Sequence, residues 1–99
     1  MVLFNTTFLV SPRADEAFHT WVRDEFIPVA LAGNILRDPL FTRVLVENPD
    51  GTSYAIQFKA DTMEAARSWE DSEGQRLKAK LFGRHGHDIL PFVTYMDIL

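Results

Sequence analysis

The sequence predicts an α+β fold with the element order βαββαβ, and three observations support it. Residues 2–10 place apolar side chains on both faces of an extended segment, which is typical of a strand in a packed sheet. The turn sequence Asn-Pro-Asp-Gly at 48–51 separates two further apolar runs and predicts a hairpin. One amphipathic helical pattern precedes this hairpin and another follows it. The 99 residues, 46% of them hydrophobic, suffice for about one globular domain, so we expect a single domain over 1–99.

The first helix is expected over about 13–32. Ser11-Pro12 is a typical start, because a hydroxyl can cap a helix and proline is tolerated in its first turn. The apolar side chains that recur at three- and four-residue spacing are Phe18, Val22, Phe26 and Val29. Gly33-Asn34 ends the pattern, since both residue types accept a left-handed conformation. Pro28 should kink the helix, or end it and start a short second segment.

The rest of the chain supplies three strands and a second helix. Strands are expected at 40–47 and 52–60, on either side of the hairpin turn, because apolar and β-branched residues dominate there. The second helix begins at Asp61-Thr62 and ends near Phe82-Gly83, with Met63, Ala66, Leu77 and Leu81 on its apolar side. A polar loop over 84–88 leads to a last strand at 89–98, where Pro91 indicates an edge position or a bulge.

This order of elements leads to a ferredoxin-like antiparallel sheet with both helices on one face, because crossover connections are right-handed. The strands are nevertheless apolar on both faces; in the last strand Phe92 and Met96 alternate with Val93 and Tyr95. Monomers rarely expose so much contiguous apolar surface. We therefore expect a homodimer through the sheet face. A monomer with an apolar sheet face, or a sheet covered by a different partner, is the alternative.

Composition excludes several classes of protein. The net charge is −4, whereas general nucleic-acid binding requires a basic face, so we expect no nucleic-acid partner. The absence of cysteine excludes disulfides and thiolate ligands. The apolar N-terminal segment has no basic n-region, and no apolar run reaches the roughly 18–20 residues that span a bilayer. We expect a cytoplasmic protein that does not act at a membrane.

Seven short motifs are spread over nearly the whole chain. They are Phe4-Asn5-x-Thr7, Phe18-x-x-Trp21, Phe26-Ile27-Pro28, Arg43-Val44-Leu45, Gly51-Thr52-x-Tyr54-x-Ile56-Gln57-Phe58, Phe82-Gly83 and Phe92-x-Thr94. Together they resemble a bacterial family of domains of unknown function, which implies a ferredoxin-like fold of the dimeric α+β barrel type and no particular reaction. Two departures stand out. Phe26 replaces a histidine that often precedes Ile-Pro in the family, which removes an acid–base candidate, and the stretch 84–88 is longer and richer in histidine.

Three carboxylates are weak candidates for catalysis. Helical geometry places Glu25, Glu70 and Glu73 within or beside the apolar stripes rather than opposite them. A carboxylate directed at a sheet is costly unless it is paired, and a raised pKa would suit a general base. The reading we favour is structural: each acid pairs with Arg43, Arg67 or Arg76, or lies at a wetter helix end.

Six residues are candidates for binding a small molecule. Asn5, Arg43 and Gln57 are polar residues in otherwise apolar strands, and their amide and guanidinium groups suit a carboxylate or carbonyl ligand. The reading we favour for them is again structural: cross-strand hydrogen bonds, or a salt bridge at a dimer seam. Trp21, Tyr54 and Trp69, with Tyr95, could form an aromatic wall around a flat molecule, although such residues more often belong to a core or an interface.

No metal site or cofactor is predicted. His85 and His87 have a spacing that two ligands of one metal could use, but the sequence marks no third ligand, so a solvated loop is expected. His19 is expected to be an exposed helix residue. The five glycines are scattered and form neither a phosphate-binding loop nor a dinucleotide-binding motif.

Three classes of function remain open. The first is a small homodimeric domain that binds a small molecule in the cleft between helices and sheet. The second is a cofactor-independent enzyme of the dimeric α+β barrel type, catalysing monooxygenation or isomerisation, which rests on fold analogy. The third is a regulatory domain whose sheet docks on another protein. An enzyme needs a cleft with converging polar groups, a binding module needs only the cleft, and a docking domain needs neither.

Overall fold

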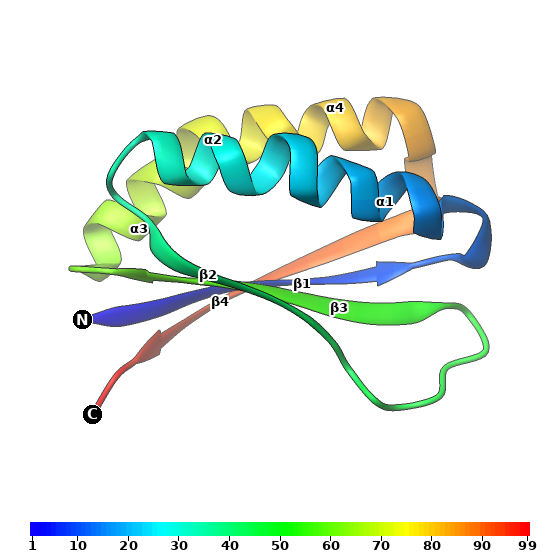
Figure 1. Ribbon diagram of the computed structural model, residues 1–99, viewed down its shortest axis with the longest axis horizontal. Coiled ribbons are helices and arrows are strands. Elements are labelled where there is room, and N and C mark those ends of the chain that lie inside the picture. Colours follow the sequence, from blue (N-terminus) through cyan, green and yellow to red (C-terminus); the bar gives the residue numbers. More distant parts are fainter.

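Four strands form one antiparallel sheet in the computed structural model, which describes all residues from 1 to 99. They are β1 (Val2–Val10), β2 (Arg37–Arg43), β3 (Thr52–Ala60) and β4 (Ile89–Asp97). Their order in the sheet is β2-β3-β1-β4. Each strand–helix–strand connection therefore passes over one strand: β1 connects to β2 past β3, and β3 connects to β4 past β1. All helices lie on one face of the sheet (Figure 1). The predicted ferredoxin-like arrangement is confirmed.

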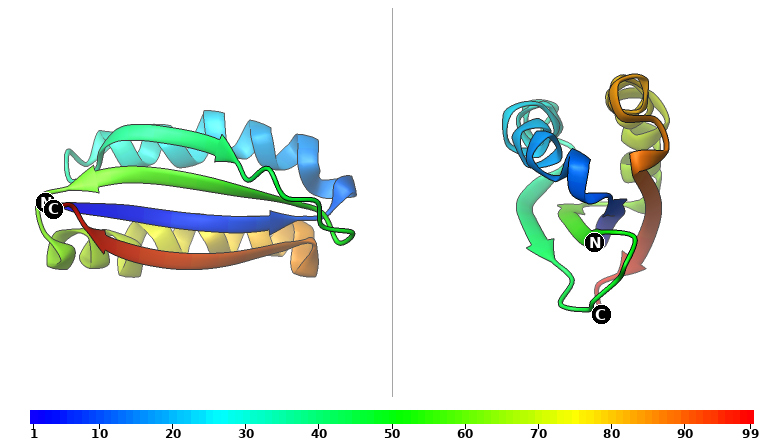
Figure 2. Two further views of the ribbon diagram at one scale, coloured as in Figure 1. Left: turned by 90° about the horizontal axis from the view of Figure 1, so that it is seen from below. Right: turned by 90° about the vertical axis from the view of Figure 1, so that its right-hand side faces the viewer.

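The helices form two rows, which lie side by side over the sheet (Figure 2). The first row consists of a 3₁₀ turn (Pro12–Ala14), α1 (Asp15–Trp21), a π-helical turn (Val22–Phe26) and α2 (Ile27–Ala32). The second row consists of α3 (Met63–Trp69), a π-helical turn (Glu70–Gly74), α4 (Gln75–His85) and a 3₁₀ turn (Gly86–Asp88).

Pro28 lies in the first turn of α2, directly after the first π-helical turn. The backbone N–H of Ile27 bonds to the carbonyl of Val22, five residues earlier, so the helix is wider here than a regular α-helix. Proline has no N–H to donate, and the wider turn accommodates the missing bond without ending the row. The expectation that Pro28 ends the helix is therefore wrong: Phe26 and Ile27 keep helical dihedral angles, and the helix continues through the π-helical turn into α2.

The helix ends confirm two cap predictions and correct two others. Ser11, the hydroxyl expected to cap the first helix, makes no capping hydrogen bond with its side chain. Thr62 caps α3, because its Oγ1 accepts a hydrogen bond of 3.1 Å from the N–H of Ala65. Asn34 has the expected left-handed conformation with φ 59°. The predicted helix end at Phe82-Gly83 is wrong: α4 continues to His85, and Gly86 with φ 55° ends it. A glycine inside a helix costs about 1 kcal/mol but does not break it.

The second strand is also corrected, since it spans Arg37–Arg43 and not 40–47. Arg43 pairs with Tyr54, and the N–H of Val44 bonds to the carbonyl of Ser53 at 2.9 Å. In this register Val46 would face Gly51, which belongs to the turn and therefore offers no strand backbone. Gly51 is held there because its Cα approaches β1 so closely that a Cβ would lie 2.1 Å from the Val10 carbonyl oxygen.

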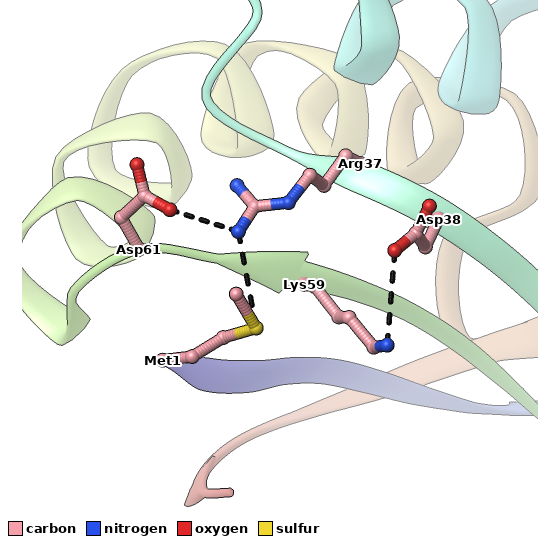
Figure 3. Close-up of polar contacts among 5 residues, drawn as sticks. All are labelled: Met1, Arg37, Asp38, Lys59 and Asp61. Carbon is pink, nitrogen blue, oxygen red and sulfur yellow. Dashed lines mark hydrogen bonds and ion pairs between the residues drawn. The ribbon is translucent and has the colours of Figure 1, made fainter.

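Ion pairs fix the start of β2 (Figure 3). Arg37 Nη2 donates to Asp61 Oδ1 at 2.8 Å and lies 3.8 Å from the sulfur of Met1. Asp38, with φ 54°, lies at an irregularity in the register, and its carboxylate is 3.7 Å from Lys59 Nζ. These pairs are largely exposed, so they orient the edge strand more than they stabilise the fold.

The core between helices and sheet is largely aromatic. Ring centroids of Phe18 and Trp21 lie 5.0 and 5.8 Å from that of Phe8. At the other end, the rings of Trp69 and Tyr95 lie 5.9 and 5.4 Å from Phe4. These rings fill the layer, so the pockets of the molecule open at its margins.

No helix covers the other face of the sheet, which we call the open face (Figure 1). Large apolar side chains project from it: Leu40 is 54% exposed, Leu90 42%, Phe92 64% and Met96 38%. The expectation that the strands are apolar on both faces is therefore confirmed, and one of those faces has no cover within the chain.

Candidate functional site

One small pocket combines aromatic, basic and hydrogen-bonding side chains, and we call it the edge pocket. It lies where α1 crosses the edge of the sheet and has a volume of about 220 Å³. Its lining residues are His19 and Arg23 from the first helical row, Phe41, Thr42 and Arg43 from β2, and Tyr54 from β3. The pocket opens at the rim of the layer between helices and sheet, because aromatic side chains fill the interior of that layer.

Three side chains form a contact chain at the edge pocket. The hydroxyl of Tyr54 donates a hydrogen bond to Oδ1 of Asp15, while Oδ2 of Asp15 lies 3.7 Å from Nε2 of His19. The ring of His19 stands at 87° to that of Tyr54, with 4.8 Å between centroids. His19 Nε2 is buried and has no hydrogen-bond partner, so Asp15 is the group that faces it.

The environment of Tyr54 keeps its phenol protonated. Burial of the side chain raises the pKa of Tyr54 above its usual value, and the hydrogen bond to Asp15 raises it further. The Arg43 guanidinium acts in the opposite direction but does not outweigh these effects. The phenol is therefore a hydrogen-bond donor at neutral pH and not a phenolate nucleophile.

Two arginines at the edge pocket have no acidic partner. No carboxylate oxygen lies within 4.0 Å of Arg23 or of Arg43. The guanidinium of Arg43 lies over the Tyr54 ring, 5.7 Å from its centroid. In a chain with net charge −4, two guanidinium groups without an acidic partner therefore lie beside an aromatic wall.

The three carboxylates predicted as weak catalytic candidates all have cationic neighbours. Glu70 is buried, and its Oε2 accepts from Gln75 and Lys78. Glu73 pairs with Arg76, three residues along the helix. Glu25 lies 3.5 Å from Arg84 across the groove between the helical rows. Only Glu73 has a partner among the arginines that we expected, and none of the three carboxylates lines the edge pocket.

The six predicted ligand-binding residues are distributed over three places. Arg43 and Tyr54 meet in the edge pocket. Asn5 and Gln57 face each other across β1 and β3 on the open face, where Asn5 donates to Thr7 Oγ1 at 3.0 Å. The two tryptophans, Trp21 and Trp69, are each 3% exposed and belong to the core, although both touch grooves along the helical rows.

Sequence reasoning missed Asp15, His19, Arg23 and Phe41. The expectation that His19 is exposed is wrong, because its side chain is only 22% exposed and packs against the rings of Phe41 and Tyr54. A signal was present: residues 15, 19 and 23 are spaced by four and therefore lie on one face of a helix. That spacing alone does not reveal which strand the face contacts.

His85 and His87 belong to no cluster of three metal-ligating side chains. No three His, Asp or Glu side chains in the molecule converge closely enough to hold a metal ion. His85 ends α4 and borders the groove between the helical rows, whereas His87 lines an apolar pocket beside β4. None of the helices has the length and apolar character required to cross a bilayer.

Comparison with solved structures shows the fold of this chain. A proposed antibiotic biosynthesis monooxygenase from Deinococcus radiodurans superposes with a TM-score of 0.70 at 13% identity, covering 100% of this chain and 93% of the other. An ethyl tert-butyl ether D (EthD) family protein from Bacillus halodurans gives 0.69 at 18% identity, with 100% of both chains covered. A dimeric ferredoxin-like protein from an uncultured marine organism gives 0.60 at 15% identity, covering 99% and 90%.

Sequence comparison assigns the family. No curated protein sequence matches the chain. The model of a domain of unknown function (DUF4286) matches residues 1–99, and this match agrees with the family resemblance and with the ferredoxin-like fold. The chain therefore belongs to the DUF4286 family, the members of which share a domain of unknown function.

Proposed function

We propose that this chain is a ligand-binding domain that holds a small planar anion in the edge pocket. The observation that carries the proposal is the convergence of two arginines without acidic partners, Arg23 and Arg43, on a pocket with an aromatic wall. A guanidinium group can hold a carboxylate through two parallel hydrogen bonds. The rings of Phe41 and Tyr54 offer apolar faces for a flat ligand.

The volume of the edge pocket limits the size of its ligand. Its volume of about 220 Å³ is below the roughly 300 Å³ at which pockets for drug-sized molecules begin. An aromatic monocarboxylate is of suitable size, with its carboxylate toward the arginines and its ring against Phe41. The hydrogen bond from Tyr54 to Asp15 fixes the position of the Tyr54 ring in the wall of the pocket.

Titration with benzoate, followed by two-dimensional NMR, tests this proposal. We expect saturable shifts at residues of the edge pocket, and at least a tenfold weaker affinity in Arg43→Gln, since a charged hydrogen bond contributes about 1.5–3 kcal/mol. Arg67→Gln is the matched control. Arg67 also lies over a tyrosine ring, 5.6 Å from the centroid of Tyr95, and also lacks an acidic partner, but it borders no pocket. Equal weakening in both variants, or shifts elsewhere, would contradict the assignment.

Catalysis at the same pocket is the second candidate function, and the relation of Asp15 to His19 favours it. A carboxylate beside one imidazole nitrogen orients the ring and leaves Nδ1 as the nitrogen that a ligand can reach. A structural neighbour is named as a proposed antibiotic biosynthesis monooxygenase. Oxygen consumption with hydroxylated aromatic acids tests this reading: His19→Asn should abolish turnover while benzoate binding remains, and turnover that persists would exclude His19 as the base.

The domain is further proposed to be a homodimer through the open face of the sheet. The exposed side chains of Leu40, Phe92 and Met96 support this, since contiguous apolar surface of this kind usually marks an interface. Two-fold dimers are the commonest small assemblies, and one structural neighbour is named as dimeric. Light scattering over a dilution series should give twice the 11.3 kDa chain mass, and Phe92→Asp should give monomers. A dimer that Phe92→Asp leaves intact would place the interface elsewhere.

A further inference from the structure

We propose that the segment Val44–Gly51 is a docking arm, and that its Leu45 enters an apolar pocket beside β4 of a second copy of this chain. This inference rests on the proposed homodimer and specifies how its two subunits engage at their edges. We name the segment the arm, and we name the pocket lined by Phe82, Gly86, His87, Ile89, Leu90 and Pro91 the β4 pocket.

The apolar side chains of the arm are exposed. Leu45 is 89% exposed and Val46 72%, although apolar and β-branched residues at this point predicted a strand. Val44 is the last residue bonded to β3, and beyond it the arm projects below the sheet, on the side away from the helices (Figure 1). No contact within the chain covers these apolar side chains. A partner on the open face would cover them.

The shape of the arm is fixed at its far end. The N–H of Asp50 bonds to the Asn48 side-chain oxygen at 2.8 Å, and the N–H of Gly51 bonds to the Asn48 carbonyl at 3.2 Å. Gly51 itself is packed against the backbone of Val10, at the end of β1. A segment held in this way loses less conformational entropy on docking than a free loop does.

The β4 pocket is the apolar counterpart of the arm. Its volume is about 390 Å³, and its walls include Phe82, 36% exposed, and Leu90, 42% exposed. β4 is an edge strand, so the pocket is accessible from the side of the sheet. Aliphatic side chains such as Leu45 and Val46 are the chemical match for this lining.

The sheet geometry brings the arm and the β4 pocket together only between copies. Val10 pairs with both Thr52 and Ile89, so the arm and the pocket lie at the same end of the sheet but at its opposite edges. A two-fold axis parallel to the strands, between two stacked open faces, places β2 of one copy over β4 of the other at this same end. Stacked sheets lie about 10 Å apart, and three extended residues span about 10 Å, which is the reach of the arm.

Charge also favours this pairing. The arm carries Glu47 and Asp50 and no basic residue. In the segment around the β4 pocket, Lys80 and His87 have no acidic partner, Arg84 is 3.5 Å from Glu25, and the one carboxylate, Asp88, is 3.1 Å from Arg13. Opposite charges at the rim of an apolar contact guide the correct orientation of the partners.

Cross-linking of introduced cysteines tests the inference, because the natural sequence contains none. The variant Leu45→Cys/Leu90→Cys, treated with a short bismaleimide, should give a covalent dimer on a denaturing gel. The single variant Leu45→Cys and the double variant Leu31→Cys/Leu90→Cys are controls that should remain mainly monomeric on the gel. Leu31 is 38% exposed and lies on α2, away from the open face.

Light scattering on the same proteins separates the possible failures. A dimer in solution without the Leu45–Leu90 cross-link, or with an equally strong cross-link in Leu45→Cys alone, would overturn the docking arm and leave the homodimer standing. Monomers at all concentrations would overturn both proposals. A second measurement uses Leu45→Asp, which should raise the dimer dissociation constant at least tenfold, whereas Leu31→Asp should leave it unchanged.

Discussion

Glu70 and Lys78 form an ion pair in which each side chain is only 5% exposed. Oε2 of Glu70 accepts hydrogen bonds from Lys78 and from Gln75, whereas Oε1 is buried without a partner. The pair joins the second π-helical turn to α4 within the second helical row. A buried charge is tolerated only while its counter-charge is present, so the two residues depend on each other.

Removal of one partner of this pair should be strongly destabilising. Lys78→Met should lower the free energy of unfolding by about 3–5 kcal/mol, because the Glu70 carboxylate remains buried without a counter-charge. The double variant Glu70→Leu/Lys78→Met should recover most of the loss. Urea unfolding measures these changes, with Arg76→Met as the control, since its exposed pair with Glu73 is worth about 1 kcal/mol or less. Equal losses for Lys78→Met and Arg76→Met would contradict the prediction.

Two helical glycines should respond to alanine in opposite directions. A Cβ on Gly74 would lie 2.5 Å from Glu70 Oε1 and 3.2 Å from the Trp69 ring, so Gly74→Ala should disturb the buried pair and lower the free energy of unfolding by about 1–3 kcal/mol. Gly83 has nothing within 4 Å, and Gly83→Ala should raise this free energy by about 0.5–1 kcal/mol through the helix propensity of alanine. Thermal unfolding of both variants measures the difference, and a shared sign would refute it.

The two helix starts should differ in their dependence on a capping hydroxyl. Thr62 accepts a hydrogen bond from the N–H of Ala65, so Thr62→Ala should cost about 1 kcal/mol. Ser11 makes no capping bond with its side chain, and Ser11→Ala should change stability by less than about 0.5 kcal/mol. Chemical denaturation of the two variants provides the comparison, and a larger loss for Ser11→Ala would show that the caps are misassigned.

The two tyrosines should ionise only above the usual range. Burial and the bond to Asp15 raise the pKa of Tyr54, and burial and the charge of Glu70 raise the pKa of Tyr95. Unfolded tyrosine ionises near pH 10, so the stability that these phenols contribute is complete below about pH 10. It is lost as the pH rises through the folded-state values.

Tyrosinate absorbance in the near ultraviolet measures this ionisation. At pH 10 the native chain should show less tyrosinate than the urea-unfolded chain. Tyr54→Phe should remove half of the final amplitude, since the chain has two tyrosines. Equal tyrosinate absorbance in the folded and unfolded states at pH 10 would disprove the predicted shifts.

The strands show which structural features the local residue pattern can predict. Alternation in 2–10 and 52–60 predicted β1 and β3 correctly, because alternate residues of a strand show which side chains lie on each of its two faces. The bounds of β2 were misplaced by several residues, because its end depends on where β3 begins and on the contact of Gly51 with Val10. Such a contact joins residues about 40 positions apart and leaves no periodic signal.

The residues of the edge pocket were likewise predictable from the sequence only in part. Arg43 and Tyr54 were identified by residue type, as a guanidinium and an aromatic ring in strands. The spacing of Asp15, His19 and Arg23 was visible as one helix face, but no local feature shows that this face lies over β2. The interior cleft expected for a ligand is filled by rings, because the aromatic side chains of both helical rows meet there.

By itself the sequence determined the order of elements, the antiparallel sheet and the apolar character of both sheet faces, since these are properties of periodicity within short segments. Only the tertiary structure decided which polar groups meet: Asp15 with Tyr54 across 39 positions, and Glu70 with Lys78 in a buried pair. The physical reason is that burial and pairing of polar groups depend on which segments pack together, and this is set by the global fold.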